Sequence, residues 1–186
     1  MSADIGARDV SEVDFIVVGA GTAGCAVASR LSEDPSVTVA LFEAGPRDRS
    51  PLFRLPAGVA AVAADPRFAW GYRTEPQTAM GGRSHPLVQA RVVGGGSSIN
   101  GMVYTRGAAR DYDAWRTCGV DGWDYAEVLP FFRKSQRSDR KDSPWHGTAG
   151  PVATTRALPC TAVAEDVLGA MRERGFAIVD DLNVPD

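Results

Sequence analysis

The sequence has few cysteines, and their arrangement argues against several kinds of site. Cys25, Cys118 and Cys160 are the three cysteines in 186 residues, and none lies in a Cys-x-x-Cys arrangement. An odd number at wide spacing argues against a disulfide framework, a zinc site and an iron–sulfur cluster, and favours a reducing compartment. Asp111 and Asp113 have no partner acids at metal-ligand spacing. We therefore predict no metal site.

The chain also lacks long apolar runs and any concentration of charge of one sign. Its formal net charge of -3 comes from acids and bases mixed along the whole chain, so no basic stripe could follow a nucleic acid or an anionic membrane. Residues 1–12 form a polar leader without the apolar segment of a signal peptide, and no run is long enough to span a bilayer. We expect a cytoplasmic protein with neither nucleic acid nor membrane as a partner.

What the chain does contain is the pattern of a βαβ unit. Residues 15–18 are continuously apolar, as in a parallel strand buried on both faces. A glycine turn follows at 19–24, then small and apolar residues at helical spacing as far as Leu31, then a second apolar run at 37–42. Strand, turn, helix and strand fit within about 30 residues, the usual length of such a unit. The predicted fold class is α/β, with a Rossmann-type fold.

The glycine turn has the spacing that holds the pyrophosphate of a dinucleotide. In this pattern Gly19 permits the tight bend, Gly21 lets the backbone approach the phosphates, and Gly24 lets the helix pack closely on the strand. The helix N-terminus then offers free N–H groups to the phosphates. The alternative is a turn that only shapes an α/β protein without a nucleotide.

An acid at the end of the second strand favours nucleotide binding over that alternative. Glu43 lies nineteen residues after Gly24, where the carboxylate that binds a ribose hydroxyl is expected. A carboxylate there would repel a 2′-phosphate, which disfavours NADP. NAD and FAD present the same adenosine end, so this unit leaves both open.

A second glycine-rich loop, residues 94–101, favours FAD. Three glycines followed by serines and an asparagine make a concave backbone surface suited to a flat or anionic group. A long excursion at 46–93 precedes it, and burying a flavin calls for such extra loops. Taken alone, the second loop could also be a flexible surface turn. In the excursion we expect a short helix over 57–64 and extended pieces over 68–74 and 83–93, joined by a turn at 80–83.

Beyond the second loop the sequence predicts mainly helix. Helices are expected over 109–117 and 125–136, followed by a charged, exposed connection over 134–142. A strand over 151–154 and an amphipathic helix that ends near Gly175 complete the chain.

Several segments together resemble the glucose-methanol-choline (GMC) oxidoreductases, FAD-dependent enzymes that oxidise alcohols to carbonyl compounds. The similarity covers nearly the whole chain, and the glycine-serine-asparagine segment is far more specific than the first glycine turn. It points toward the choline dehydrogenase and aryl-alcohol oxidase branches. The segments that carry it, besides the βαβ unit, are residues 70–77, 91–102, 106–107, 111–115, 122–123, 128–132 and 146–151.

The resemblance implies a cofactor site and a domain organisation. It places the first glycine turn at the FAD pyrophosphate, Glu43 at the adenosine ribose and residues 100–103 near the isoalloxazine ring. It also implies an FAD-binding domain over 13–150, with the excursion at 46–93 covering the cofactor, and the start of a substrate domain over 151–186. The cofactor-binding residues so predicted are Gly19, Gly21, Thr22, Ala23, Gly24, Glu43, Ala44, Arg91, Val93, Gly94, Gly95, Gly96, Ser97, Ser98, Asn100, Gly101, Met102 and Val103.

Two departures from the family pattern limit what the resemblance implies. Some members attach FAD through a histidine just before the asparagine; Ile99 stands here, so FAD should be bound noncovalently. The family's catalytic histidine, with its His or Asn partner, lies near the C-terminus of much longer chains. His85 and His146 correspond neither to that catalytic histidine nor to its partner, and are interpreted as surface or turn histidines. No catalytic residue is therefore predicted.

The leading hypothesis is the FAD-binding portion of a flavin-dependent alcohol oxidoreductase with a small-molecule alcohol as substrate. Such an enzyme transfers hydride from a CH–OH donor to FAD N5. A second chain could supply the C-terminal half. The alternatives are a noncatalytic dinucleotide-binding fragment or subunit that needs a second chain, and a nicotinamide-dependent dehydrogenase fragment, against which the second glycine loop argues.

Overall fold

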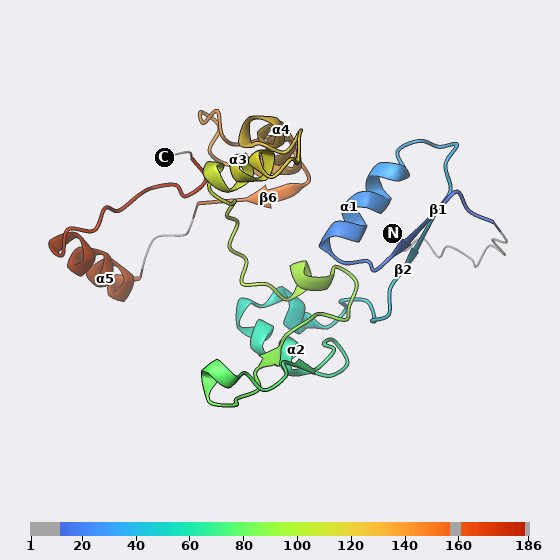
Figure 1. Cartoon of the computed structure of the whole chain (residues 1–186), viewed down its shortest axis with the longest axis horizontal. Helices are drawn as coiled ribbons and strands as arrows, with labels where there is room; N and C mark the ends of the chain where they lie inside the picture. The colour runs from blue at the N-terminus through green and yellow to red at the C-terminus, as the bar shows by residue number, and fades with distance from the viewer. Residues whose placement is uncertain (1–11, 157–160, 185–186) are drawn as a thin grey trace. The chain divides into compact units, whose positions relative to one another are not determined.

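The computed structural model describes residues 12–156 and 161–184. These residues form two compact units that divide between Val103 and Tyr104, and each is described by itself. The domain boundaries expected from the sequence stay predictions. The helices and strands (Figure 1), in chain order, are β1 (Phe15–Val18), α1 (Thr22–Leu31), β2 (Val39–Phe42), α2 (Val59–Ala64), β3 (Tyr72–Arg73), β4 (Pro86–Leu87), α3 (Ala109–Thr117), α4 (Tyr125–Ser135), β5 (Gln136–Ser138), β6 (Val152–Thr154) and α5 (Ala162–Glu173).

The first unit opens with the expected βαβ arrangement. β1 and β2 pair in parallel, with Phe15 opposite Val39 and Val18 opposite Phe42. α1 begins at Thr22, within the glycine turn, and ends before the Asp34-Pro35 pair, where proline disfavours further helix. The α/β, Rossmann-type start of the chain is therefore confirmed.

The expectation that both strands are buried on both faces is wrong for this chain. Ile16 is 64% exposed and Val18 84%, and Phe42 is 57% exposed on the neighbouring strand. The physical reason is that, among the described elements, α1 is the one that packs against both strands. The rest of the apolar surface of the strand pair stays open.

The excursion after β2 folds into a small layer with its own apolar core. Val62, Phe68 and Val92 are buried together, and the Phe53 ring packs edge-on against Phe68 with centroids 4.9 Å apart. The expected short helix is present as α2 with a preceding 3-10 turn at Pro56–Gly58. β3 and β4 pair antiparallel in the two extended pieces, and the turn between them runs through left-handed backbone at Gly81 and Gly82.

In the second unit the two predicted helices are present, and α3 has the expected bounds. The Asp124 side chain caps α4 by accepting a hydrogen bond from the Glu127 N–H. The exposed connection expected over 134–142 is partly wrong, because β5 lies there, parallel to β6, and buries Gln136 and Ser138. Alternate residues of a strand face opposite sides, so Arg137 between them stays exposed while both neighbours point inward.

The amphipathic helix expected near the end of the chain is present as α5. The segment after it returns to the body formed by α4, β5 and β6, where Asp180, Asp181 and Asn183 make hydrogen bonds. In the part of the chain that the structure describes, no helix is both long and apolar enough to cross a bilayer.

Candidate functional site

The two glycine-rich loops lie against one another in the first unit, although about 70 residues separate them. The Gly94 N–H donates to the Ala20 carbonyl at 2.7 Å. A methyl group on Gly95 would stand 2.6 Å from the Gly21 Cα, so the two backbones approach without any side chain between them. Gly94 and Gly95 both have positive φ, at 92° and 54°, a conformation that glycine adopts at little cost.

The N-terminus of α1 is open at this contact. A side chain on Gly24 would overlap the Gly19 carbonyl, so the helix starts as close to the strand as a backbone can. Gly21 caps the helix without a side chain, and the N–H groups of Thr22, Ala23 and Gly24 find no acceptor among the described residues. Unpaired N–H groups at the positive end of a helix dipole form an anion site suited to a pyrophosphate.

Glu43 ties the end of β2 to the first glycine turn. Its carboxylate accepts hydrogen bonds from the Ala20 N–H at 2.8 Å and from the Gly45 N–H at 2.9 Å. An ionised carboxylate has about four acceptor positions, so about two remain for ligand hydroxyls. Ala44, the next residue, is exposed. Gly45 packs against the backbone at Arg91, because a side chain on Gly45 would overlap the Arg91 carbonyl. The turn, the acid and the start of the second loop are thus one connected structure.

The serines of the second loop stabilise the loop itself. Residues Gly95–Ser98 form a 3-10 turn in which the Ser97 hydroxyl donates to the Gly94 carbonyl and the Ser98 hydroxyl donates to the Val93 carbonyl. A hydroxyl has one proton to donate, so these two present only acceptor lone pairs to a ligand. The open backbone at Gly96 remains available to a flat group.

After the loop the chain takes an uncommon conformation. The Asn100 amide oxygen accepts from the Met102 N–H at 2.9 Å. Met102 has a φ of 58°, the one positive value recorded for a residue other than glycine in the described chain. A non-glycine residue in that region is strained by about 1 to 3 kcal/mol, and such residues cluster at functional sites. Gly101, Met102 and Val103 are all exposed.

Arg91, predicted to line a cofactor, is bound to other residues of the excursion. Its guanidinium donates to the Pro66 carbonyl at 2.9 Å and lies 5.3 Å from the centre of the Trp70 ring. Its backbone N–H donates to the Phe68 carbonyl at 2.7 Å. The buried Nε has no hydrogen-bond partner in the described chain.

Of the two histidines interpreted as surface or turn residues, His146 is buried. It lies in a turn but is only 4% exposed, and its ring contacts Gln136 and Asp181. His146 is buried because the next residue, Gly147, packs directly against the backbone of α4. A side chain at Gly147 would overlap the Arg133 carbonyl. His85 is half-buried. The one sequence feature that singled out His146 is the His-Gly-x-x-Gly-Pro motif. The motif does not predict that the ring contacts Gln136 and Asp181.

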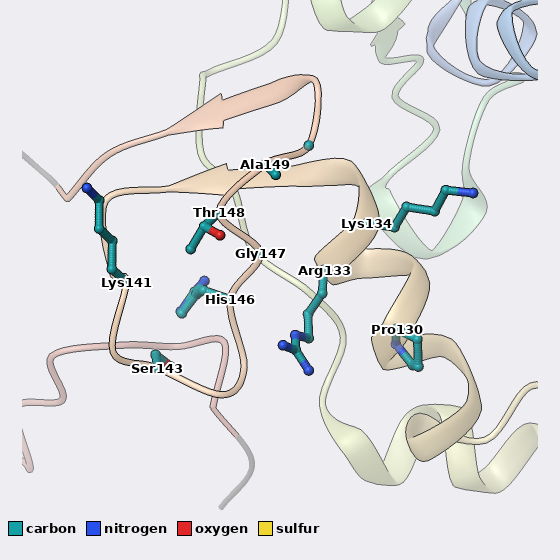
Figure 2. Close-up of a pocket in the computed structure, with 10 residues that line it drawn as sticks. Pro130, Arg133, Lys134, Lys141, Ser143, His146, Gly147, Thr148 and Ala149 are labelled. Carbon is teal, nitrogen blue, oxygen red and sulfur yellow. The ribbon is translucent and has the colours of Figure 1, made fainter.

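A hollow of about 630 Å³ lies beside His146, wholly within the second unit. Arg133, Lys134 and Lys141 line it, but Figure 2 shows Lys134 and Lys141 extending in opposite directions. The three cations therefore do not converge on one point as an anion site requires. No group of three or more His, Cys, Asp or Glu side chains that could hold a metal ion occurs within residues 12–156 and 161–184.

Comparisons with known proteins assign the chain to a class. Residues 13–185 match the family described as GMC oxidoreductase. The chain is 42% identical over 172 residues to the oxygen-dependent choline dehydrogenase of Brucella anthropi, covering 92% of this chain and 31% of that protein. It is 41% identical over 179 residues to the mitochondrial choline dehydrogenase of Mus musculus, covering 92% of this chain and 30% of that protein.

Solved structures agree with the sequence relatives. Pyridoxine 4-oxidase from Mesorbium loti has a TM-score of 0.87 at 32% identity, over 92% of this chain and 34% of that one. A formate oxidase variant from Aspergillus oryzae RIB40, studied for its FAD modification, has a TM-score of 0.83 at 28% identity. The match covers 95% of this chain and 33% of that one. The chain belongs to the GMC oxidoreductase family, and its fold is the family's N-terminal FAD-binding domain.

The chain is similar to one part of these relatives. It spans about a third of the length of each. In the relatives the remaining two thirds belong to the same polypeptide, so the comparisons give no support to the separate second chain that was considered from the sequence.

Proposed function

We propose that this chain binds FAD noncovalently and forms the cofactor-binding portion of a flavin-dependent oxidoreductase that acts on the CH–OH group of a small-molecule alcohol. The observation that carries the proposal is the backbone contact between the two glycine loops beside the open N-terminus of α1. FAD, when bound, supplies the hydride acceptor that amino-acid side chains lack.

The residues fit FAD at both ends of the molecule. The N–H groups of Thr22, Ala23 and Gly24 bind the pyrophosphate, and the free acceptor positions of Glu43 bind the adenosine ribose. Gly94 to Ser98 would provide a backbone surface for the cofactor, and Asn100 to Val103 are proposed to lie near the flavin ring. Arg91 and Val93 act from behind this surface, since the Arg91 side chain binds the Pro66 carbonyl and the Trp70 ring.

Noncovalent attachment is supported by the position of Ile99. Its side chain packs against the apolar core of Val62, Phe68 and Val92. An aliphatic group in that place has no atom that can bond to the flavin.

The chain holds the cofactor without supplying the catalytic base. Both ring nitrogens of His146 contact protein groups, so neither is free to take a proton from an alcohol. The substrate domain is proposed to start at residue 151, after an FAD-binding domain over 13–150. A cytoplasmic location is proposed as well, although the mouse relative is named as mitochondrial.

The test is to mix the purified chain with FAD and remove free cofactor by gel filtration. We expect flavin absorption bands that co-elute with the protein and that move to the supernatant after acid precipitation. A colourless protein would contradict cofactor binding, and flavin left in the precipitate would contradict noncovalent attachment. With an alcohol and a dye acceptor we expect no turnover; turnover would show that the chain contains a base.

A second candidate is a noncatalytic dinucleotide-binding unit that functions by association. The exposed apolar residues of the β1–β2 pair favour it, because contiguous apolar surface of this kind is typical of binding faces. Light scattering of the FAD-loaded protein separates the two candidates: a monomer that binds FAD supports the first, and an oligomer that binds FAD supports the second.

A further inference from the structure

The second glycine loop is anchored as far as Ile99. The Ser98 hydroxyl donates to the Val93 carbonyl at 3.0 Å, and the Ile99 N–H donates to the Gly96 carbonyl at 3.2 Å. The Ile99 side chain packs against the apolar core of the excursion. The backbone is therefore held in place up to this residue by contacts with the rest of the first unit.

The residues that follow Ile99 are open to solvent. Met102 is 63% exposed and Val103 79%, and a side chain on Gly101 would meet nothing within 4 Å. Among the described residues, one hydrogen bond involves the backbone of residues 100–103, and it joins the Met102 N–H to the Asn100 side chain. Packing therefore does not impose a conformation on this stretch.

Met102 nevertheless has a conformation that a residue with a side chain disfavours. Its φ of 58° lies in the left-handed region, where the Cβ of an L residue crowds a neighbouring carbonyl oxygen. An exposed residue without a restraint would relax to a negative φ, because nothing around it opposes the change. The conformation of Met102 must therefore be held by a specific contact.

The Asn100 side chain supplies this contact. The Met102 N–H donates to the Asn100 amide oxygen at 2.9 Å. Because an N–H can only donate, the atom that faces it must be the oxygen of the amide. An asparagine that accepts from the backbone two residues further on closes a turn in place of a backbone carbonyl. The amide nitrogen of Asn100 has no acceptor among the described residues.

We propose that Asn100 is a positioning residue that holds Met102 in the left-handed conformation, so that residues 100–103 have their cofactor-binding shape before the cofactor arrives. The inference rests on the proposed function, in which this stretch lies near the flavin ring. Strained backbone is retained at ligand sites, where it gives the ligand a defined surface. A stretch that already has its binding shape loses no affinity to rearrangement.

The competing explanation is that Asn100 acts directly, by donating a hydrogen bond from its amide nitrogen to the cofactor. The two roles differ once the strain at Met102 is removed. Glycine adopts a positive φ at little cost, so Met102→Gly makes the restraint unnecessary and leaves the amide nitrogen of Asn100 in place. If Asn100 acts through Met102, its own substitution should then have little further effect.

The first measurement follows the Met102 amide without cofactor. The chain has four methionines, so nuclear magnetic resonance of protein labelled with ¹⁵N-methionine gives few signals. Asn100→Ala should accelerate hydrogen exchange at Met102 roughly three- to tenfold, the effect of one hydrogen bond. Asn100→Asp keeps an acceptor oxygen and should restore slow exchange, and Met171 in α5 should be unaffected in both variants. Unchanged exchange at Met102 in Asn100→Ala overturns the proposal.

The second measurement is a double-mutant cycle of FAD affinity, followed by quenching of flavin fluorescence. In the parent chain, Asn100→Ala should weaken FAD binding roughly three- to tenfold. In the Met102→Gly background the same substitution should change the affinity less than about twofold. Equal losses in the two backgrounds overturn the positioning role and indicate direct donation by the Asn100 amide.

The two measurements separate failure of this inference from failure of the proposed function. A parent chain that takes up no FAD contradicts the proposed function, and with it any role of Asn100 toward the cofactor. A parent chain that binds FAD, combined with unchanged exchange at Met102 or with equal losses in the cycle, overturns the positioning role alone. Faster exchange in Asn100→Ala together with a loss of affinity that Met102→Gly suppresses supports the proposal.

Discussion

Gly95 lies so close to Gly21 that a methyl group on Gly95 would stand 2.6 Å from the Gly21 Cα. This relationship joins the loop at the start of α1 to the loop that follows the excursion. The proposed cofactor site is therefore formed by two segments that are distant in the sequence, and their contact can be broken at a single position.

Gly95→Ala is expected to separate the two loops. The new methyl group collides with Gly21 and is attached to a backbone with a φ of 54°, which together cost more than about 2 kcal/mol. FAD affinity, measured by quenching of flavin fluorescence, should fall at least about tenfold. Gly169→Ala in α5 is the control, since a methyl group there meets nothing within 4 Å and the residue lies outside the proposed site; an equal loss in both variants would contradict the role of the contact.

Gly24→Ala is expected to move α1 away from the turn that precedes it. The methyl group would overlap the Gly19 carbonyl, so the helix N-terminus cannot keep its place. Both the melting temperature and FAD binding should decrease. Gly169→Ala in α5 adds the same atom in open space and should be neutral or stabilising by about 0.5 to 1 kcal/mol. Unchanged FAD binding in Gly24→Ala would disprove the proposed phosphate site.

Glu43→Ala is expected to destabilise the first unit even without cofactor. It leaves the Ala20 and Gly45 N–H groups without their acceptor, at a cost of about 1 to 3 kcal/mol. Urea denaturation measures this loss, and FAD titration should show weaker binding as well. Glu33→Gln, which alters an exposed pair with Arg30, should change neither quantity measurably.

Asp14 should make the stability of the first unit decrease as the pH falls into the acid range. The Thr38 N–H and then the Thr38 hydroxyl hold the pKa of this carboxyl below its usual value of 3.8, against a smaller effect of burial. A carboxyl with a lowered pKa in the folded state stabilises above its unfolded pKa, and that contribution is lost as the pH falls through the folded value. Asp14→Asn should therefore melt below the parent at pH 6, and the difference should shrink near pH 3. Asp166→Asn, on exposed α5, is the control; a difference that stays constant with pH would refute the assignment.

Local patterns allowed much of the fold to be predicted from the sequence. β1, α1, α3 and the excursion's short helix follow from apolar periodicity, glycine turns and proline positions, which act over a few residues. The strand at Gln136–Ser138 was missed because its residues are polar and charged, and only its pairing with β6 buries them. Burial of β1 and β2 could not be predicted either, because it depends on what covers them.

The candidate site also has parts that the sequence predicted and parts that it did not. Gly19, Gly21, Gly24 and Glu43 were placed by spacing alone, and the structure sets them together. The cofactor roles of Arg91, Ser97 and Ser98 stay predictions, and their side chains bind protein carbonyls, which the sequence did not indicate. Composition gave no sign of the His146 network, because its three members lie on β5, a turn and the segment after α5.

Gly45 beside the Arg91 carbonyl has a consequence for how this sequence can evolve. The group that a side chain at Gly45 would strike is main chain, which every amino acid carries. Replacing Arg91 by a smaller residue leaves that carbonyl in place, so no second substitution at the contact can compensate for a change at Gly45. A genetic search for suppressors of a Gly45 variant should therefore recover true revertants or changes that shift a whole loop, and none at position 91.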